Sequence, residues 1–237
     1  MDGIKLVNVG KYYTVKREQV KVLEDINLDL PANKITVILG RSGCGKTTLL
    51  RLVAGLETFE QGEIQATHVK RKAYVFQEDR LMPWLTVRKN ITFGLKDKEI
   101  DHEKISGIIQ MVGLEQFEAA YPVQLSGGMK QRASIARAFA YNPDFIMMDE
   151  PFSALDYFTR EQMQNELLRI NKTLNCSILF VTHSIDEALT LGDKIVILEK
   201  GIIKSQYEIE EESNNRDLLD DKFVELKKKI INDLKVI

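Results

Sequence analysis

A glycine-rich stretch that ends in lysine and threonine carries the clearest chemistry in this sequence. Gly40, Gly45, Lys46 and Thr47 match the pattern G-x-x-x-x-G-K-[ST], which binds the phosphates of a nucleotide. Glycine lets the backbone curl until successive N–H groups point inward, and a following helix adds unpaired N–H groups and the positive end of its dipole. These residues therefore predict an ATP or GTP site.

Two side chains of this loop have predicted roles of their own. Lys46 would reach the β- and γ-phosphates as a point charge, and the Thr47 hydroxyl would bind Mg²⁺, a cation that prefers oxygen ligands. The apolar run over residues 35–39 and the leucines after the loop predict strand, loop and helix, which argues against an incidental glycine-rich turn. The loop residues expected to hold the nucleotide are Gly40, Arg41, Ser42, Gly43, Cys44, Gly45, Lys46, Thr47 and Thr48.

A pair of acids at the end of an apolar run is a second chemical signal. Residues 145–148 are apolar throughout, as in a central parallel strand, and Asp149 and Glu150 follow directly. In phosphate-loop enzymes an acid at this place completes the Mg²⁺ site, and a neighbouring Glu acts as general base toward the attacking water. Since side chains alternate in direction along a strand, the two acids can hold these different roles. A solvated acidic loop is the alternative.

Two further polar residues follow predicted strands. Gln77 comes after the strand expected over residues 73–76, and His183 comes after the apolar strand over residues 177–182. Ligands of open α/β sheets lie outside the carboxyl ends of the strands, so both side chains could reach the nucleotide or its Mg²⁺. Taken alone, a solvated loop residue at Gln77 and a structural histidine at His183 are the more common explanations.

A second stretch with anion-binding chemistry precedes an alanine-rich helix. Ser126, Gly127 and Gly128 would place a hydroxyl and exposed N–H groups at the start of that helix. One nucleotide cannot easily use two helix starts so distant in sequence, and an ordinary serine N-cap explains the same residues.

The elements that must position these groups follow from hydrophobic spacing. Short alternating segments at residues 4–7, 20–23 and 26–30 predict strands with one buried face. Tyr12 and Tyr13, between the first two of them, could stack on a base or cover the sheet. Residues 101–117 have helical spacing with Gly113 as the expected terminator.

The C-terminal third continues this organisation. A hairpin is predicted over residues 194–204, and a polar linker and an amphipathic helix follow it. The apolar positions of that helix most simply pack on the same domain, although a partner could also bind them. They are Leu219, Phe223, Leu226, Ile230 and Leu234.

Composition excludes several classes of protein. The chain has 237 residues, a formal net charge of -2 and two cysteines. The charge gives no support to nucleic-acid binding, and the cysteine count favours a reducing compartment over a disulfide framework. No signal segment or apolar run of membrane-spanning length is present, so we expect a cytoplasmic protein whose membrane role comes through a partner.

With these elements in this order, the chain resembles the ATP-binding-cassette ATPases over about residues 4–205. The most specific element is the stretch over residues 126–131, which matches the family's Ser-Gly-Gly-x-x-Gln signature. The resemblance implies an α/β fold: a P-loop NTPase core with a mainly parallel sheet, an N-terminal antiparallel β subdomain and a helical subdomain at about residues 86–141. Residues 1–205 would form the ATPase domain, and residues 206–237 the linker and C-terminal helix.

Carried over residue by residue, the resemblance implies ATP and Mg²⁺ as ligands. Tyr13 would stack on the base, Thr47 and Gln77 would bind Mg²⁺, and Asp149 would bind it through water. His183 would sense and position the γ-phosphate. The implied catalytic residues are Glu150, His183, Gln77 and Lys46.

In that family two cassettes pair head to tail, which gives the second anion-binding stretch a purpose. Ser126, Gly127 and Gly128 of one copy would close over ATP held by Lys46 of the other. Asp156 would communicate across the dimer. A second copy of the chain is therefore the first expected partner.

Residues 75–87 look like the importer cassettes of the nitrate, sulfonate and taurine group. An apolar loop such as Leu81–Leu85 would normally tuck into the core. In such cassettes, however, this segment lies near the groove that receives the coupling helix of a membrane permease, so Met82, Trp84 and Leu85 would contact that partner through the Gln77–Leu85 region. The resemblance thus implies the ATP-hydrolysing subunit of an importer, peripheral on the inner face of the cell membrane and served indirectly by an extracytoplasmic solute-binding protein.

Two other functions remain as alternatives. A cassette ATPase that works on DNA or the ribosome usually carries coiled-coil or tandem-cassette additions, which this length makes improbable. A small-molecule kinase could use the same phosphate loop, but it would leave the stretch from Ser126 to Gly128 unexplained.

Overall fold

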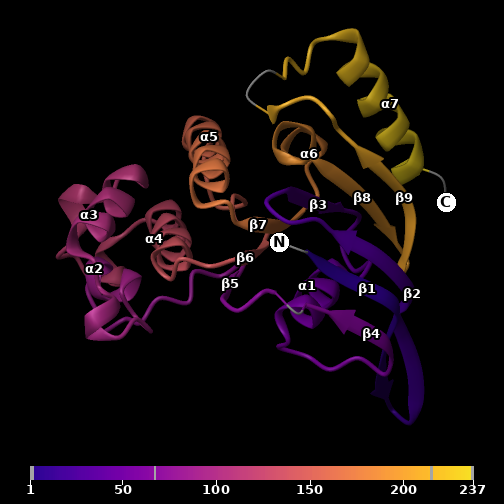
Figure 1. Ribbon diagram of the computed structural model, residues 1–237, viewed down its shortest axis with the longest axis horizontal. Coiled ribbons are helices and arrows are strands. Elements are labelled where there is room, and N and C mark those ends of the chain that lie inside the picture. The colour runs from indigo at the N-terminus through magenta and orange to yellow at the C-terminus, as the bar shows by residue number, and fades with distance from the viewer. Residues whose placement is uncertain (1–2, 67, 214–215, 236–237) are drawn as a thin grey trace.

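A six-stranded sheet lies at the centre of the computed structural model, which describes residues 3–66, 68–213 and 216–235 (Figure 1). The strand order is β5-β6-β7-β3-β8-β9, and all neighbours are parallel except β8 and β9. The strands are β3 (Ile35–Leu39), β5 (Lys72–Val75), β6 (Phe145–Asp149), β7 (Ser177–Thr182), β8 (Lys194–Glu199) and β9 (Ile202–Glu208). The predicted terminal hairpin is confirmed as the pair β8 and β9.

The continuous apolar runs in the sequence become the middle of this sheet. Every residue of β3, β6 and β7 is buried, because helices cover both faces of a parallel sheet. Those helices are α1 (Lys46–Ala54), α5 (Tyr157–Leu174), α6 (Ile185–Leu191) and α7 (Asp221–Lys235). The functional groups expected after β3, β6 and β7 therefore start from rigid, neighbouring strand ends.

A separate antiparallel sheet is formed by β1 (Ile4–Val15), β2 (Glu18–Leu30) and β4 (Gln61–Gln65). The sequence predicted three short strands up to residue 30, and this was wrong. There are two long strands, and Tyr12 and Tyr13 lie within β1. Shifts in pairing register near Val9 and Lys11 change the two-residue alternation, so the continuous strands read as separate pieces.

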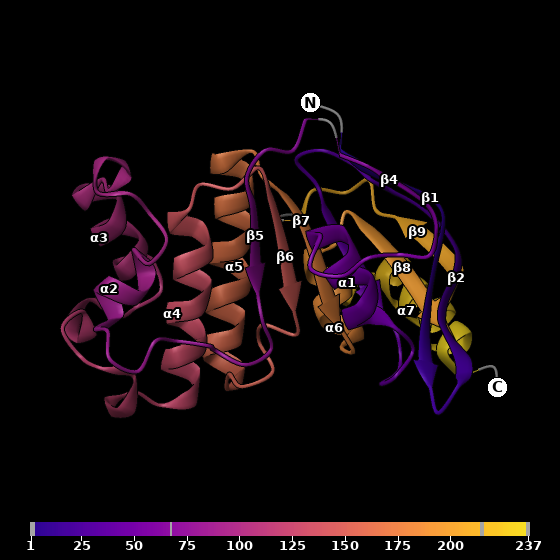
Figure 2. The ribbon, with the colours of Figure 1, turned by 90° about the horizontal axis from the view of Figure 1, so that it is seen from below.

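The helical part stands beside the main sheet. It comprises α2 (Val87–Ile91), α3 (His102–Met111), α4 (Gly127–Ala140) and the 3₁₀ turns Asp97–Glu99, Glu115–Phe117 and Pro122–Gln124. Figure 2 shows α4 between α5 and the small helices α2 and α3. The helical spacing over residues 101–117 corresponds to α3, which ends at Met111, and to the 3₁₀ turn Glu115–Phe117. The expected terminator Gly113 lies between them in the left-handed conformation, at φ 62°.

The C-terminal helix α7 packs on α6 and β8. Phe223 and Ile230 of its apolar stripe are buried in the main core, as predicted, whereas Leu219 lies before the helix and is 84% exposed. The proposed division after residue 205 falls inside β9, which continues to Glu208 because it pairs with β8 along its length. Residues 214 and 215 of the predicted linker lie outside the described part of the chain.

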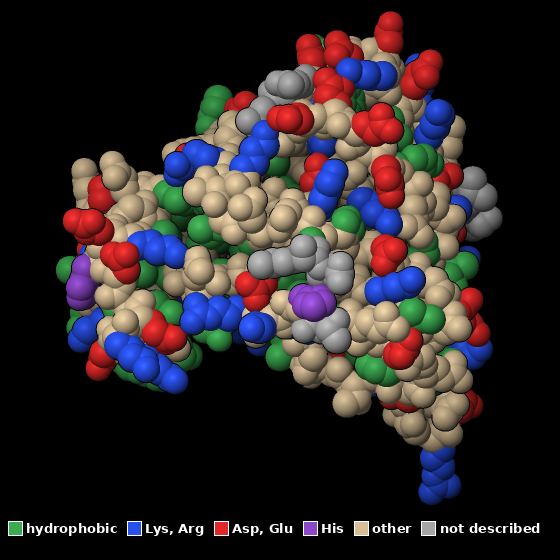
Figure 3. Space-filling view, in the orientation of Figure 1, with side chains coloured by type: hydrophobic (Ala, Val, Ile, Leu, Met, Phe, Trp, Pro, Cys, Tyr) green, Lys and Arg blue, Asp and Glu red, His purple; other side chains and the backbone are tan. Residues whose placement is uncertain are grey.

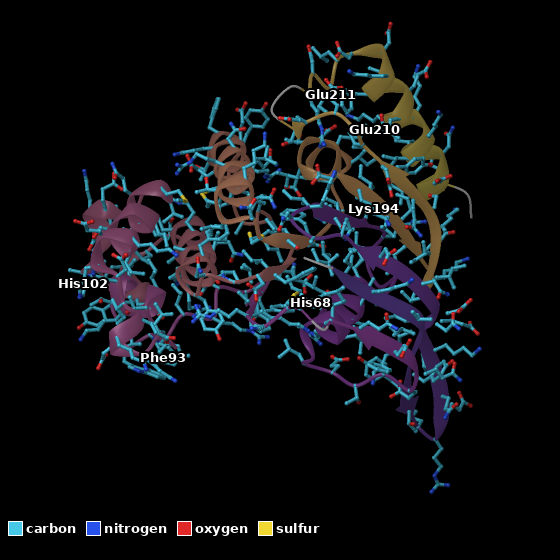
Figure 4. The ribbon with its side chains drawn as sticks, viewed as in Figure 1. His68, Phe93, His102, Lys194, Glu210 and Glu211 are labelled. Atoms are coloured by element: carbon cyan, nitrogen blue, oxygen red, sulfur yellow. The ribbon has the colours of Figure 1, made fainter. Side chains whose placement is uncertain are left out.

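Acidic side chains gather at the end of the molecule near α7 (Figure 3). Glu210 and Glu211 lie there, while Phe93 and His102 mark the helical part at the opposite side (Figure 4). Among the described residues, none of the helices combines the length and apolar composition that a membrane span requires.

Candidate nucleotide-binding site

The glycine-rich loop connects the end of β3 to the start of α1. Gly45 has a φ of 105° and lies so close to β2 that an added Cβ would meet Leu23 Cδ2 at 2.9 Å. At Gly40 an added Cβ would lie 2.4 Å from the carbonyl oxygen of Leu198 in β8. Gly45 is therefore required both by its backbone conformation and by close neighbours, and Gly40 by its close neighbours.

Lys46 is held inside the loop. Its side chain is buried, and Nζ donates hydrogen bonds to the carbonyl oxygens of Gly40 at 2.9 Å and Arg41 at 3.1 Å. Both acceptors are neutral backbone groups, so the positive charge stays uncompensated and attracts a phosphate. The lysine is thus positioned before a nucleotide arrives.

Two of the three side chains expected to bind Mg²⁺, Thr47 and Asp149, are neighbours in space, although about a hundred residues separate them in sequence. Thr47 Oγ1 donates to Asp149 Oδ1 at 3.1 Å, and the Tyr74 hydroxyl lies 3.5 Å from Asp149 Oδ2. Among the described residues there is no cluster of three or more His, Cys, Asp or Glu that could enclose a metal by itself. One hydroxyl and one carboxylate fit Mg²⁺, which usually completes its shell with water and substrate phosphates.

Glu150 turns the chain sharply at the end of β6. Its φ is 45°, an uncommon value for a residue with a Cβ, and its N–H donates to the carbonyl oxygen of Val181 at 3.0 Å. Ser153 fixes the turn from the other side, since its N–H and Oγ both donate to the Glu150 carbonyl oxygen. Glu150 Oε2 lies 3.0 Å from His183 Nδ1, which joins two of the predicted catalytic residues.

A single cavity of about 740 Å³ brings most of the predicted residues together. It is lined by Val22, Arg41, Ser42, Gly43, Gly45, Lys46, Thr47, Thr48, Gln77, Glu150 and His183. The carboxyl ends of β5, β6 and β7 thus face the glycine-rich loop. Sequence reasoning missed Val22, because a valine in a strand carries no chemical signature.

Cys44 belongs to the loop but faces another space. Its side chain lines a separate cavity of about 300 Å³ together with Leu198, Lys200 and Leu234. Burial raises the pKa of its thiol above the usual value, which opposes reactivity. Only its backbone can therefore serve the nucleotide site.

Tyr13 lies at the edge of the loop, outside the residues that line the main cavity. Its ring is 37% exposed, and its hydroxyl donates to Glu57 and interacts with the side chain of Thr48. Lys11 Nζ lies 4.9 Å from the ring centroid. The tyrosine is thus accessible beside the loop rather than packed into the sheet.

The predicted residues of the second anion-binding stretch do not line the cavity of their own chain. Ser126 is the N-cap of α4, with Oγ accepting from the Met129 N–H at 3.3 Å. Asp156 similarly caps α5 and accepts from the Thr159 N–H at 3.1 Å. Within one chain these residues serve as helix caps, and a second copy would be needed to bring them to a nucleotide.

The segment around Gln77 is held by two residues of α4, Gln131 at the end of the Ser-Gly-Gly-x-x-Gln stretch and Arg137, which sequence reasoning did not single out. Gln131 Nε2 donates to the Phe76 carbonyl oxygen at 3.3 Å, and Arg137 donates to those of Asp79 and Arg80. Both donors belong to α4. The sequence did not reveal these contacts, because the acceptors are backbone atoms distant in sequence.

Asn90 holds the other end of the same segment. It is fully buried, accepts from the Met82 N–H at 2.7 Å and donates to the carbonyl oxygens of Met82, Leu85 and Thr86. These bonds satisfy backbone polar groups of the turn from its buried side. The Trp84 side chain lies on the outside and is 70% exposed. The tryptophan is presented to solvent, so it does not tuck into the core.

Replacing Asp149 with Asn is expected to stabilise the Mg²⁺-free chain. Burial raises the pKa of this carboxyl above its unfolded value, so ionising it inside the protein costs stability. The wild type is therefore most stable below the unfolded pKa and loses stability as pH rises through the folded pKa. The variant escapes this loss, and its Tm at neutral pH should rise by about 2 to 4 °C, as for 1 kcal/mol in a chain of this size.

Thermal unfolding in EDTA, followed from acid to neutral pH, measures this effect. The advantage of the Asp149→Asn variant should vanish at the acid end, where the wild-type carboxyl is protonated in both states. Asp97→Asn, at an exposed position, is the matched control and should leave Tm unchanged. A lower Tm of the Asp149→Asn chain than of the wild type at neutral pH would contradict this prediction. It would show that losing the carboxylate contacts with Thr47 and Tyr74 costs more stability than removing a buried charge gains.

Comparison with known proteins gives consistent matches. A family model described as ABC transporter matches residues 23–153. An uncharacterised ABC transporter ATP-binding protein of Methanocaldococcus jannaschii is 46% identical over 98% of this chain and 91% of its own length. The aliphatic sulfonates import ATP-binding protein of Bacillus cereus is 40% identical over 96% of this chain and 94% of its own length.

A solved structure shares the fold. It is the dimeric structure of a post-hydrolysis state of an ATP-binding cassette bound to ADP and Pi, with a TM-score of 0.81 and 30% identity. The similarity covers 88% of this chain and 99% of the other. It confirms the predicted fold class, an α/β nucleotide-binding core with an antiparallel β part and a helical part.

Proposed function

Because the chain belongs to the ABC transporter family and is an ATP-binding, ATP-hydrolysing protein, we propose that it powers a membrane importer as its nucleotide-binding subunit. The observation that carries this proposal is the cavity that joins the glycine-rich loop to Gln77, Glu150 and His183. Its mixture of an uncompensated cation, a general base and strand-end polar groups suits phosphoryl transfer to water.

The chain's own residues divide the work of hydrolysis. Lys46 and the loop N–H groups bind and orient the phosphates, and Glu150 accepts a proton from the attacking water. His183, 3.0 Å from Glu150, keeps that carboxylate in place and contacts the γ-phosphate. When bound, Mg²⁺ neutralises developing phosphate charge, and Thr47, Gln77 and Asp149 would hold it, the last through water. Tyr13 would stack on the base beside Thr48.

A second copy of the chain would complete the site. Ser126, Gly127 and Gly128 lie outside their own cavity, and the N–H groups at the start of α4 suit an anion. Asp156 would face the same interface. The dimeric state of the similar ADP-bound cassette supports the pairing of two copies, which we propose to be head to tail. We propose that ATP brings two copies together and that hydrolysis separates them.

The Gln77–Leu85 region would contact the permease. Trp84 is exposed at a turn that Asn90 fixes from inside, and a rigid, exposed tryptophan suits the centre of a protein interface. This contact would keep the chain on the inner face of the cell membrane. The relative that imports aliphatic sulfonates favours a solute of the nitrate, sulfonate or taurine kind, delivered by an extracytoplasmic solute-binding protein.

The division of the chain follows from these roles. The ATPase domain would extend to the end of β9 at Glu208, and its helical subdomain at about residues 86–141 would carry Ser126 at the dimer face. The residues after Glu208 would add the linker and α7, which packs on that domain.

Reconstitution tests the transport role directly. The chain is purified with a candidate permease and placed in vesicles that enclose ATP, and the solute-binding protein is added outside. ATP-dependent uptake of an alkanesulfonate or taurine is the expected result. ATP hydrolysis without uptake of any solute of this group would contradict the importer assignment, and ATP-dependent phosphorylation of a small molecule would favour a kinase.

Replacing Trp84 with Ala is expected to weaken binding to the permease by about tenfold or more, because buried tryptophans dominate interface energies. The ATPase rate of the isolated chain should not change, since the side chain is exposed and distant from the cavity lining. Binding to the detergent-solubilised permease measures the effect. Leu219→Ala, at a position 84% exposed before α7, is the control and should bind normally.

A further inference from the structure

Two side chains that the proposed mechanism does not use, an acid and an arginine, lie between His183 and the segment that carries Asp156. Glu187 is in the first turn of α6 and only 8% exposed. Arg160 is in the first turn of α5, directly after the segment that carries Asp156. The two helices pack against each other beside β7, as Figure 1 shows.

Glu187 holds the loop that contains His183. The Thr182 hydroxyl donates to Glu187 Oε2 at 2.5 Å, and the same oxygen of Thr182 accepts from the Ser184 N–H at 3.0 Å. Ser184 Oγ in turn accepts from the Glu187 N–H at 3.3 Å. The residues on both sides of His183 are thus fixed to Glu187, Thr182 through the buried carboxylate and Ser184 through the backbone N–H.

Arg160 connects that carboxylate to the Asp156 segment. Its Nη2 donates to the Leu155 carbonyl oxygen at 2.9 Å, and its Nε lies 3.7 Å from Glu187 Oε1. Arg160 Nε is buried and has no hydrogen-bond partner among the described residues. A buried donor without an acceptor is costly, and here a carboxylate oxygen lies just beyond hydrogen-bond distance.

The contact between Arg160 and Glu187 is therefore incomplete in the single chain. A shift of less than an ångström, about the difference between 3.7 Å and an ordinary charged hydrogen bond, would complete it. Burial raises the pKa of Glu187, while its bond from Thr182 and the charge of Arg160 lower it. Both partners would gain from the closer contact.

We propose that Glu187 and Arg160 are positioning residues that tie His183 to the Asp156 segment, and that their contact closes when a second copy presses on that segment. This inference rests on the proposed pairing of two chains. Through this contact, the binding of one copy would affect the position of the other copy's catalytic residues. The path runs from Leu155 through Arg160 and Glu187 to His183, which lies against Glu150.

Steady-state ATP hydrolysis by four chains tests the link: wild type, Arg160→Met, Glu187→Gln and the double variant. Each single variant should lower kcat by about tenfold with KM changed less than about threefold, and the double variant should be no slower than the singles, because the two residues act as a unit. Independent effects that multiply to about a hundredfold would overturn the link, as would an unchanged kcat. Arg169→Met, which breaks the exposed ion pair with Glu166 on the same helix, is the control and should keep full activity.

A second pair of variants separates positioning from folding. Thr182→Ser keeps the hydroxyl that bridges Glu187 and Ser184, whereas Thr182→Val removes it at nearly constant volume. The Ser chain should keep most of its kcat and the Val chain should lose about tenfold, with Tm of both well above the assay temperature. Equal activity of the two chains would overturn the role of the bridge.

The same samples show whether it is the proposed pairing of two chains, and not the link between Arg160 and Glu187, that is contradicted. ATP-dependent dimerisation of the wild type, measured by light scattering, reports on the proposed function alone. If the wild type hydrolyses ATP without pairing, the proposed function fails. If it pairs and hydrolyses while the Arg160 and Glu187 variants keep full kcat, only the link described here is overturned.

Discussion

A chain with Glu150 replaced by Gln is expected to bind ATP and pair with a second copy but to hydrolyse ATP about a hundredfold or more slowly, the usual cost of losing a general base. Gln has the shape of Glu and can keep a contact with His183, 3.0 Å away in the wild type. It cannot accept the proton of the attacking water. The defect should therefore lie in kcat, with ATP affinity retained.

In the presence of ATP, phosphate release measures hydrolysis and light scattering measures pairing. The variant should accumulate as a dimer, because the step that separates the copies has been removed. Glu161→Gln, an exposed position on α5, makes the same chemical change elsewhere and should behave as wild type. Rapid hydrolysis by the Glu150 variant would show that another group activates the water.

Replacing Lys46 with Met should lower ATP affinity by about 10- to 100-fold, since hydrogen bonds to charged groups contribute about 1.5–3 kcal/mol. Among the described residues the hydrogen-bond partners of Lys46 Nζ are the carbonyl oxygens of Gly40 and Arg41, so its charge is available to bind phosphate. Hydrolysis should fall to background. ATP-dependent pairing should also be lost, because the second copy would close over a nucleotide that is no longer held.

Titration calorimetry with ATP and light scattering check both losses. Lys228→Met, at an exposed position of α7, removes the same charge away from the site and should bind ATP normally. A comparison of Tm without nucleotide shows whether the Lys46 variant is folded. A Lys46 variant that still pairs on adding ATP would contradict the proposed role of this loop in dimer closure.

The site was predictable where chemistry and local context coincide. The glycine-rich loop has its own sequence pattern, and Asp149, Glu150 and His183 follow apolar runs that could only be central strands. Parallel neighbours place such strand ends side by side, so the sequence implied a shared cavity before its geometry was known. Gln77 also follows a predicted strand, but taken alone it was more simply explained as a solvated loop residue, and the cavity now places it beside the loop.

What the sequence could not reveal depends on distant backbone atoms and on departures from regular spacing. The carbonyl acceptors of Gln131 and Arg137 have no side-chain signature, and neither has the contact of Arg160 with Glu187. Register shifts in β1 interrupt the alternation of buried and exposed residues that would have predicted one long strand. The side-chain direction of Cys44 within the loop was equally invisible.

The two attachments of α4 to the segment after Gln77 have a mechanical consequence. The helix has 14 residues, starts at Gly127 beside Ser126, and holds Phe76, Asp79 and Arg80 through side chains further along it. At 1.5 Å per residue it is a stiff rod about 20 Å long. A tilt of about 10° about one end would carry the other end by about 3 to 4 Å along this length. A force on Trp84 would therefore displace Ser126 while the hydrogen bonds between α4 and this segment stay intact.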